Sequence, residues 1–280
     1  MGRDQLTVGN LEYELEVAIR LAHQAGEAIM GYYQTGLDVD EKTGGEPVTA
    51  ADRAADELIL CGLRDAFPLD GMLTEESDDD LSRLERERVW IVDPLDGTTE
   101  FISETGEFSV MIGLTVRGQP VLGVIYQPVA ERLYHALEGS GAYCTEGGQT
   151  GQLWVSTRTD LAQMCMVASR SHYSDLVRSV REALEVLSVR HLGSVGLKVG
   201  MVARGACDLY VATTVAKEWD VCAPHALLLE AGGELTTLCG ELPVYNQADV
   251  AVCRGLIGSN GRVHGHLVEA VAALQEGQER

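Results

Sequence analysis

Two aspartates directly follow an apolar segment in the middle of the chain. Residues 89–101 read VWIVDPLDGTTEF and place Asp93 and Asp96 three positions apart. Because Pro94 has no N–H to donate, the apolar strand is expected to end there, with both acids at its mouth. Such paired acids are costly unless a cation neutralises them, and Mg²⁺ commonly takes carboxylates together with a substrate phosphate. If a helix starts at the following Gly-Thr, its free N–H groups would bind an anion, so the segment predicts phosphoryl chemistry.

Two other interpretations of this segment compete with the first. Asp, Pro and Gly are ordinary turn residues, so the segment alone is also compatible with a polar turn after a strand. A strand followed by a DxDGT motif is typical of haloacid-dehalogenase-type phosphatases, which also bind Mg²⁺. Here two residues, Pro94 and Leu95, separate the acids instead of one. That register would misplace a nucleophile against its acid–base partner and argues against this alternative.

Composition and charge restrict the kinds of partner that the chain would bind. The 280 residues are 45% hydrophobic and have a mean hydropathy near zero, which is typical of a globular protein with one large domain or two lobes. The formal net charge is −22 and the pI is near 4.6, so nucleic acid and anionic membranes are not expected as partners. No apolar run reaches the length needed to span a membrane.

The cysteines and the N-terminal residues indicate a cytoplasmic protein. The seven cysteines are odd in number and form no CxxC pair, which argues against a disulfide framework or a zinc site. Reduced thiols in the cytosol are the expectation. Residues 1–10 contain no apolar stretch typical of a secretory signal.

The first third of the chain predicts two helices and two acids near strand or helix ends. Apolar residues at helical spacing predict helices over residues 10–34 and 50–66. Thr49 followed three positions later by Asp52 resembles a capping box, and an acid in a first turn is explained by the helix dipole alone. Glu75 follows a short expected strand, residues 72–74. The next expected strand along the chain is the one that precedes Asp93. Neighbouring strands would bring Glu75 beside Asp93.

The remaining segments predict an α/β architecture. Strands are expected over residues 108–116, 121–127 and 133–137, and a turn-rich glycine segment follows up to residue 151. Further strands are expected over residues 164–168, 207–212 and 253–258, and helices over residues 173–187, 194–204, 219–231 and 260–275. Asp220 falls in the first turn of one of these helices, where an acid is again explained by the dipole alone.

The combination and order of these motifs resemble the inositol monophosphatase superfamily, a lithium-sensitive, Mg²⁺-dependent phosphatase group. The motifs are residues 47–52 (PVTAAD), 74–77 (TEES), 93–98 (DPLDGT) and 219–220 (WD), with Ala223 and the Ala-Gly-Gly at 231–233 beyond them. The resemblance extends from about residue 10 to residue 275. Residues 100–108, the SRSH at 169–172 and the segment from Gly193 to Lys198 are most similar to the CysQ-type 3'(2'),5'-bisphosphate nucleotidases.

The resemblance implies a layered α-β-α-β-α sandwich and a ligand set for two or three Mg²⁺ ions. Glu75, Asp93 and the Leu95 carbonyl would hold one ion, and Asp93, Asp96 and Asp220 a second. The division implied is an N-terminal lobe, residues 1–155, with most metal ligands, and a C-terminal lobe, residues 156–280, with Asp220 and the selectivity residues.

The resemblance also implies the roles of the remaining site residues. A metal-activated water, oriented by Glu75 and by the Thr98 hydroxyl with Asp52 behind it, would attack phosphorus directly. The N–H groups of Gly97 and Thr98 would hold phosphate oxygens. Contact with the substrate is expected from Ser194, Lys198 and Glu218. For Arg170 and His172, contact with a second phosphate and a structural role are both left open.

Three positions depart from the pattern of that branch. Thr99 stands where lysine is common, Val195 and Gly196 replace part of a serine pair after Ser194, and the loop around Lys42 reads GGEP at residues 44–47 instead of acid-x-Ser-Pro. The first two departures fall where selectivity is expected to be set. The third leaves the role of Lys42 open.

The resulting expectation is a Mg²⁺-dependent phosphomonoesterase that converts adenosine 3',5'-bisphosphate to AMP and phosphate. Inositol monophosphate or fructose 1,6-bisphosphate on the same centre is the first alternative, and an inactive metal-binding scaffold is the second. The expected partner is a small-molecule phosphate ester. The resemblance leaves a homodimer and a monomer both open.

Overall fold

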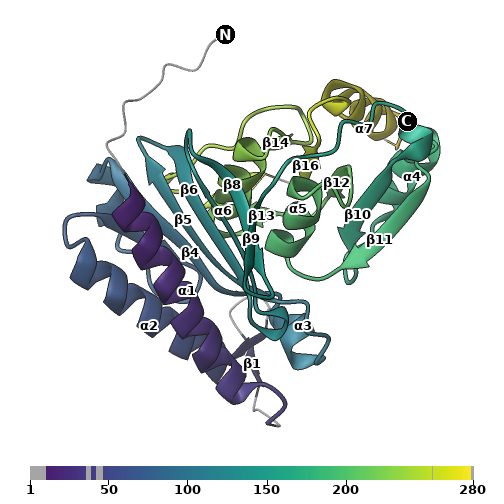
Figure 1. The fold of residues 1–280 in the computed structure, drawn as a ribbon. Helices are drawn as coiled ribbons and strands as arrows, with labels where there is room; N and C mark the ends of the chain where they lie inside the picture. The colour runs from purple at the N-terminus through teal and green to yellow at the C-terminus, as the bar shows by residue number, and fades with distance from the viewer. Residues whose placement is uncertain (1–10, 36–38, 42–46, 254, 279–280) are drawn as a thin grey trace.

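The chain folds into five alternating layers of helices and sheets (Figure 1). The computed structural model describes residues 11–35, 39–41, 47–253 and 255–278. In order, the layers are α1 (Glu12–Tyr32) with α2 (Ala50–Ala66), a seven-stranded sheet, α5 (Val195–Ala203) with α6 (Glu218–Glu230), a five-stranded sheet, and α4 (Asp175–Ala183) with α7 (His264–Gln278). The predicted α-β-α-β-α sandwich is therefore confirmed. None of the helices in the described ranges combines the length and apolar character that a membrane crossing requires.

The seven-stranded sheet has its strands in sequence order. They are β3 (Gly71–Thr74), β4 (Arg88–Asp96), β5 (Ser109–Val116), β6 (Gln119–Gln127), β7 (Arg132–Leu137), β8 (Gly141–Glu146) and β9 (Gln149–Gln152). Only the β3–β4 pair of this sheet is parallel. The segment expected to be irregular forms β8 and β9, because Gly147 and Gly148, at φ 58° and 74°, make the tight turn of a hairpin.

Strand β4 does not end at Pro94, contrary to the prediction. It continues to Asp96, and its pairing with β5 shifts register between Asp93 and Asp96. Pro94 lies inside this irregularity, where the ladder does not need an N–H from it. The bulge keeps both aspartates at the end of one strand.

The second sheet has the order β11-β10-β12-β16-β14. Its strands are β10 (Cys165–Ser169), β11 (Ser188–Leu192), β12 (Leu209–Ala212), β14 (Glu234–Thr237) and β16 (Leu256–Ser259). Neither β11 nor β14 was predicted. The expected helix over residues 173–187 is shorter, because Glu185 has a positive φ of 51° and the chain turns into β11.

The smaller elements connect these layers. Two short antiparallel pairs join β1 (Val39–Glu41) with β2 (Pro47–Thr49) and β13 (Ala216–Lys217) with β15 (Ala251–Cys253). The short helices are α3 (Thr98–Ile102), η1 (Ser82–Glu85), η2 (Pro128–Ala130) and η3 (Leu161–Gln163). Helix α7 begins at His264, later than predicted, because the Asn260 side chain donates to Ser156 and to the Arg158 carbonyl in a preceding turn.

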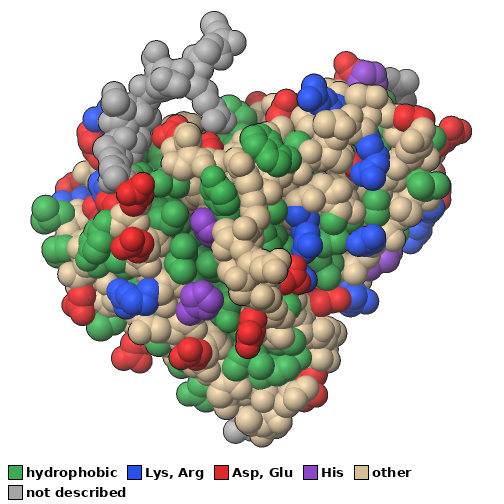
Figure 2. All heavy atoms as spheres, viewed as in Figure 1, with side chains coloured by type: hydrophobic (Ala, Val, Ile, Leu, Met, Phe, Trp, Pro, Cys, Tyr) green, Lys and Arg blue, Asp and Glu red, His purple; other side chains and the backbone are tan. Residues whose placement is uncertain are grey.

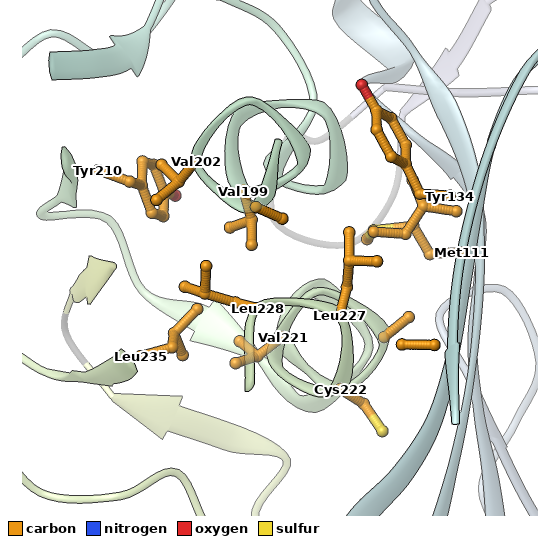
Figure 3. Packing of buried hydrophobic residues seen from close by; sticks show 14 of the residues in the cluster. Met111, Tyr134, Val199, Val202, Tyr210, Val221, Cys222, Leu227, Leu228 and Leu235 are labelled. Atoms are coloured by element: carbon orange, nitrogen blue, oxygen red, sulfur yellow. The ribbon is translucent and has the colours of Figure 1, made fainter. Parts of the chain in front are cut away.

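Helix α6 is buried between the two sheets, and this burial positions its N-terminus. Figure 3 shows Leu227 of α6 pointing toward Met111 of β5, while Leu228 points away from that sheet. A helix that is apolar on all sides is typical of a core position. Gly123 of β6 lets the helix approach closely, because a Cβ there would lie 2.3 Å from the Ala223 carbonyl oxygen. Because α6 packs closely on the sheet, the position of Asp220 in its first turn is fixed relative to the sheet.

Candidate active site

Nine of the predicted site residues line one cavity of about 300 Å³. They are Glu75, Asp93, Leu95, Asp96, Gly97, Thr98, Ser194, Lys198 and Asp220. The cavity lies where β3 and β4 end and where α3, α5 and α6 begin. Polar groups from both halves of the chain therefore converge on one space.

Glu75 and Asp93 lie side by side, as the strand order predicted. Strands β3 and β4 are parallel with Thr74 opposite Val92, and the Glu75 N–H donates to the Val92 carbonyl at 3.2 Å. Asp93 is only 2% exposed, and its Oδ1 accepts a hydrogen bond from the Leu95 N–H at 3.0 Å. The two carboxylates thus project from adjacent strands into the same cavity.

Asp96 joins the strand to the first turn of α5. Its carboxylate accepts hydrogen bonds from the N–H groups of Val195 and Gly196, at 3.0 and 2.9 Å, and from the Ser194 hydroxyl. A carboxylate at a helix N-terminus is favoured by the unpaired N–H groups and by the helix dipole. Ser194 has a positive φ of 55°, a strained conformation for a residue with a side chain, and these bonds hold it there.

Thr98 and Asp52 form a hydrogen-bonded pair at the wall of the cavity. The Thr98 hydroxyl donates to Asp52 Oδ1 at 3.0 Å. Asp52 Oδ2 accepts from both the N–H and the hydroxyl of Thr49, at 2.8 and 2.6 Å, so the predicted capping box is present. Asp52 is 1% exposed and lies behind Thr98, outside the cavity lining.

Gly97 forms the turn between β4 and α3. Its φ of 101° is a conformation that residues with a Cβ rarely adopt, and an added Cβ would lie 3.1 Å from the Glu107 carbonyl oxygen. The predicted helix start after Gly97 is present as α3, whose first residue is Thr98. The N–H groups at this start lack intrahelical partners, as they do in any helix.

The structure separates two residues that the sequence analysis grouped together in α6. Asp220 lines the cavity, and its Oδ2 accepts a hydrogen bond from the Lys217 N–H at 2.7 Å. Glu218, expected to contact substrate, is fully buried outside the cavity lining. Its oxygens accept from the N–H groups of Asn246 and Gln247, at 2.7 and 2.8 Å. That prediction is corrected, since the Glu218 carboxylate holds a loop instead.

Lys198 is the buried cation of the cavity. It is 4% exposed, and its pKa is lowered because burial disfavours the ammonium form more than Asp96, Glu100 and Asp220 favour it. Lys217 and His172 also line the cavity. Among the described residues that line the cavity, these three carry a lysine ammonium or a histidine ring.

Arg170 and His172 occupy different environments. His172 lines the cavity, whereas Arg170 does not. The Arg170 guanidinium donates to Glu107 and to the His191 carbonyl, and Glu107 Oε2 also accepts from the Gly193 N–H at 2.8 Å. Arg170 thus contacts Glu107, which in turn binds the residue before Ser194.

The departures from the family pattern also separate in space. Thr99 is exposed at the cavity and Val195 lines it. Gly196 instead packs on the sheet, where a Cβ would lie 2.7 Å from Met111 Sδ and 2.9 Å from Ile125 Cγ2. Of the replaced pair, only Val195 can thus face a substrate. Lys42 lies outside the described residues.

Some cavity residues were not predicted as site residues. Glu100, Tyr210 and Lys217 all line the cavity, and Glu100 is 7% exposed with its Oε1 accepting from Ser171 at 2.6 Å. Glu100 and Lys217 each lie within three residues of a predicted site residue, Thr98 and Asp220 respectively, which was the available signal. Tyr210 is an apolar-patterned residue of β12, and its sequence carried no signal of this kind.

The donor set fits hard divalent cations. The four predicted carboxylate ligands and Leu95, whose carbonyl is the fifth predicted donor, line the same cavity, and oxygen is the ligand that Mg²⁺ prefers. In the described part of the chain no three acidic, histidine or cysteine side chains are gathered into a closed cluster. Asp96 and Asp220 are each directed toward backbone N–H groups, which accounts for the open arrangement.

The acidity of the chain is not concentrated in one patch of the face drawn in Figure 2. Acidic side chains are spread over both halves of that face, and Lys and Arg are interspersed, more often on the C-terminal half. The interior cavity, by contrast, gathers carboxylates beside few cations. A local excess of buried acids is what a bound cation would neutralise.

Comparisons with known proteins give matches over most of the chain. The family model described as "Inositol monophosphatase family" matches residues 10–276. The 3'(2'),5'-bisphosphate nucleotidase CysQ of Salmonella typhimurium is 40% identical over 226 residues, which are 79% of this chain and 89% of that protein. The CysQ of Aggregatibacter actinomycetemcomitans is 36% identical over 84% of this chain and 88% of that protein.

Solved structures share the fold over most of the chain. The extragenic suppressor protein suhB from Bartonella henselae has a TM-score of 0.81 at 29% identity and covers 92% of this chain and 98% of its own. CysQ from Bacteroides thetaiotaomicron, described as a bacterial member of the inositol monophosphatase family, has a TM-score of 0.77 at 33% identity. It covers 90% of this chain and 99% of its own.

Proposed function

The chain belongs to the inositol monophosphatase family and is a phosphatase, and from this premise we propose that it hydrolyses adenosine 3',5'-bisphosphate to AMP and phosphate with Mg²⁺. The observation that supports phosphoryl chemistry is the convergence of the four predicted carboxylate ligands, Thr98 with Asp52 behind it, and a helix start on one cavity. The nucleotide substrate is supported by curated relatives of 31 to 40% identity that are named 3'(2'),5'-bisphosphate nucleotidases.

The acids of the cavity divide into two overlapping ligand sets. Glu75, Asp93 and the Leu95 carbonyl would hold one Mg²⁺, and Asp93, Asp96 and Asp220 a second. Asp93 is common to both sets because it lies between Glu75, directly after β3, and Asp96 on its own strand. When bound, such ions would neutralise the phosphoryl oxygens and increase the acidity of the attacking water.

The Thr98–Asp52 pair is suited to accept the proton of that water. The Thr98 hydroxyl directs its hydrogen to Asp52 Oδ1, so a lone pair of its oxygen is free to face the cavity. Asp52 Oδ2 accepts from the N–H and the hydroxyl of Thr49, so Oδ1 is left to face Thr98. A proton passed to Thr98 Oγ1 can therefore be matched by transfer of the hydroxyl proton to Asp52.

The substrate would lie between the start of α3 and the first turn of α5. The N–H groups at Gly97 and Thr98 are suited to phosphate oxygens, because a helix start offers unpaired donors. Lys198 lies one turn inside α5 and adds a buried positive charge for a second phosphate. Ser194 would orient the substrate through the same turn. Glu218 is not part of this proposal, because it faces the loop at residues 246–247.

Inositol monophosphate is the second candidate substrate, with fructose 1,6-bisphosphate as a further one. The fold match to an inositol monophosphatase from Thermotoga maritima, with a TM-score of 0.80 at 29% identity, favours keeping it. Both candidates would use the same acids and the same proton acceptor. They differ from the nucleotide in the part of the molecule that faces Thr99, Val195 and Lys198.

A substrate panel tests the proposal. Phosphate release would be measured with and without Mg²⁺ from adenosine 3',5'-bisphosphate, inositol 1-phosphate and fructose 1,6-bisphosphate at equal concentrations. We expect Mg²⁺-dependent release, with the nucleotide highest in kcat/KM. A higher kcat/KM for inositol 1-phosphate would reassign the substrate and keep the centre. Absence of release from all three would reject phosphatase activity on these substrate classes and favour the inactive scaffold.

A further inference from the structure

Helix α2 carries a second buried aspartate that the proposed mechanism does not use. Asp56 lies one turn after Asp52, so both carboxylates project from the same face of the helix. Asp56 is 4% exposed, and it does not line the cavity. A buried carboxylate is costly unless hydrogen bonds compensate for lost water, so its contacts indicate what it does.

The Asp56 carboxylate binds the two hydroxyls on either side of the Glu75-Glu76 turn. The Thr74 hydroxyl donates to Oδ1, and the Ser77 hydroxyl donates to Oδ2. The Glu76 N–H in turn approaches the Thr74 hydroxyl oxygen at 3.5 Å. One side chain therefore holds the residue before Glu75 and the second residue after it.

These contacts add to a bond between the backbone of Glu75 and β4. The Glu75 N–H is bound to the Val92 carbonyl at 3.2 Å. The neighbouring Thr74 and Ser77 are bound to Asp56 of α2. The turn is thus held between a strand and a helix at the point where Glu75 leaves the sheet.

We propose that Asp56 is a positioning residue for Glu75, acting through the hydroxyls of Thr74 and Ser77 and setting the affinity of the metal site. This inference rests on the proposed role of Glu75 as a metal ligand. Residues that orient a metal ligand typically change metal affinity by about 10- to 100-fold when they are replaced. Helix α2 then orients both sides of the site, with Asp52 holding Thr98 and Asp56 holding the Glu75 turn.

A purely structural role for Asp56 predicts a different result. Loss of buried hydrogen bonds alone would lower the melting temperature and leave the metal affinity of the folded protein unchanged. The test therefore needs metal affinity and stability measured separately on the same variants.

The experiment is titration of the full chain with Mn²⁺ alone, in the absence of substrate, with free Mn²⁺ followed by electron paramagnetic resonance. Glu75→Gln defines the binding that does not depend on this site. Asp56→Asn keeps the side-chain volume, but its amide can accept from at most one of the two hydroxyls. Glu57→Gln, at the exposed neighbouring position of α2, removes the same charge without these contacts and is the matched control.

Ser77→Ala is the second variant, because Ser77 is exposed and its replacement does not open the core. We expect Asp56→Asn to raise the Mn²⁺ dissociation constant about tenfold or more. Ser77→Ala should also raise this dissociation constant, and Glu57→Gln should leave it unchanged. Melting temperatures in EDTA would show that the variants are folded. If Asp56→Asn does not fold, Ser77→Ala decides the result.

The outcomes separate this inference from the proposed function. Wild-type Mn²⁺ affinity in folded Asp56→Asn and Ser77→Ala would overturn the positioning role and leave the metal site intact. If Glu75→Gln binds Mn²⁺ as the wild type does, both the assignment of Glu75 and the inference built on it are overturned.

Discussion

The Ser194 hydroxyl donates a hydrogen bond to Asp96, although 98 positions separate the two residues in the chain. The N–H groups of Val195 and Gly196 donate to the same carboxylate. These bonds connect the end of β4 in the first sheet to the start of α5 between the sheets. Asp96 therefore belongs both to the proposed metal site and to the packing of α5, and a change there has two measurable effects.

Asp96→Asn is expected to reduce turnover by more than about 100-fold. Replacing a residue that only orients a metal ligand typically lowers metal affinity or activity by about 10- to 100-fold. Loss of the charge of a ligand itself should therefore lower activity more. The Asn amide would also face N–H donors of α5 and lose part of the cap, which lowers the free energy of unfolding by about 1–3 kcal/mol. The measurements are kcat with saturating Mg²⁺ and thermal unfolding by circular dichroism. Near-wild-type turnover would contradict the metal assignment.

Asp208→Asn is the matched control for that variant. Asp208 is fully buried in the second half of the chain and likewise accepts from a backbone N–H, that of Cys165 at 2.8 Å. Its replacement should also lower the free energy of unfolding, but kcat of the folded enzyme should not change. Similar losses of kcat in both variants would attribute the Asp96 effect to folding.

Thr98→Val is expected to lower kcat by about 10²-fold or more and to change KM little. Valine has the shape of threonine but no oxygen to accept a proton in front of Asp52, and general base catalysis typically contributes 10²- to 10⁴-fold. Thr115→Val is the control, since this buried hydroxyl donates to the Val89 carbonyl inside the sheet. Steady-state kinetics on the best substrate of the panel would decide. A Thr98→Val kcat equal to that of Thr115→Val would remove Thr98 from proton transfer.

Relationships within a segment or between neighbouring strands were predictable from the sequence. The capping box of Thr49 and Asp52 is local, and the approach of Glu75 to Asp93 follows from two short apolar segments in succession. The five-layer order followed from the family resemblance. The nine cavity residues gathered as expected because their motifs lie at the ends of strands and the starts of helices.

Relationships that depend on tertiary packing were not predictable in this way. The pattern around Glu218 shows only an acid in a first helical turn, whereas its orientation is set by the loop at residues 246–247. The continuation of β4 past Pro94 depends on a bulge opposite β5. Strands β8 and β9 were missed because a Gly-Gly hairpin turn resembles irregular chain when the partner strand is unknown.

Thr99→Lys is expected to shift preference toward the bisphosphates. Thr99 is exposed at the cavity one residue beyond the helix start, so a lysine there adds a cation near a phosphate. A partly exposed ion pair contributes up to about 1 kcal/mol, which corresponds to a two- to fivefold change in relative kcat/KM. Thr99→Met has similar length without charge and is the control. Unchanged ratios across the three substrates would show that this position does not set selectivity.

Gly196→Ala is expected to lower the free energy of unfolding by about 1–3 kcal/mol, the usual cost of overpacking. The new methyl would meet Met111 Sδ at 2.7 Å and Ile125 Cγ2 at 2.9 Å. Gly31→Ala is the matched control, because Gly31 lies in α1 with no atom within 4 Å of an added Cβ and should be stabilised by about 0.5–1 kcal/mol. Urea unfolding of both variants tests this, and equal shifts would contradict the close approach of α5 to the sheet.

Glu107→Gln is expected to destabilise the protein in a pH-dependent way. Burial raises the pKa of Glu107, whereas hydrogen bonds from Arg170 and from the Gly193 N–H lower it. The lowering is the larger effect, so the pKa lies below its ordinary value of 4.5. A carboxylate with a depressed pKa in the folded state stabilises the protein fully above 4.5, and this contribution is lost as the pH falls through the folded pKa.

The measurement is the difference in melting temperature between the wild type and Glu107→Gln across pH. At neutral pH we expect the variant to melt about 2–4 °C lower, the shift that corresponds to about 1 kcal/mol in a chain of this size. The difference should stay constant down to about pH 5 and shrink below it, because the wild-type carboxyl then becomes neutral like the amide. A difference that persists unchanged to about pH 3.5 would mean that the Glu107 charge does not hold the Gly193–Ser194 turn, and that the contact depends on shape alone.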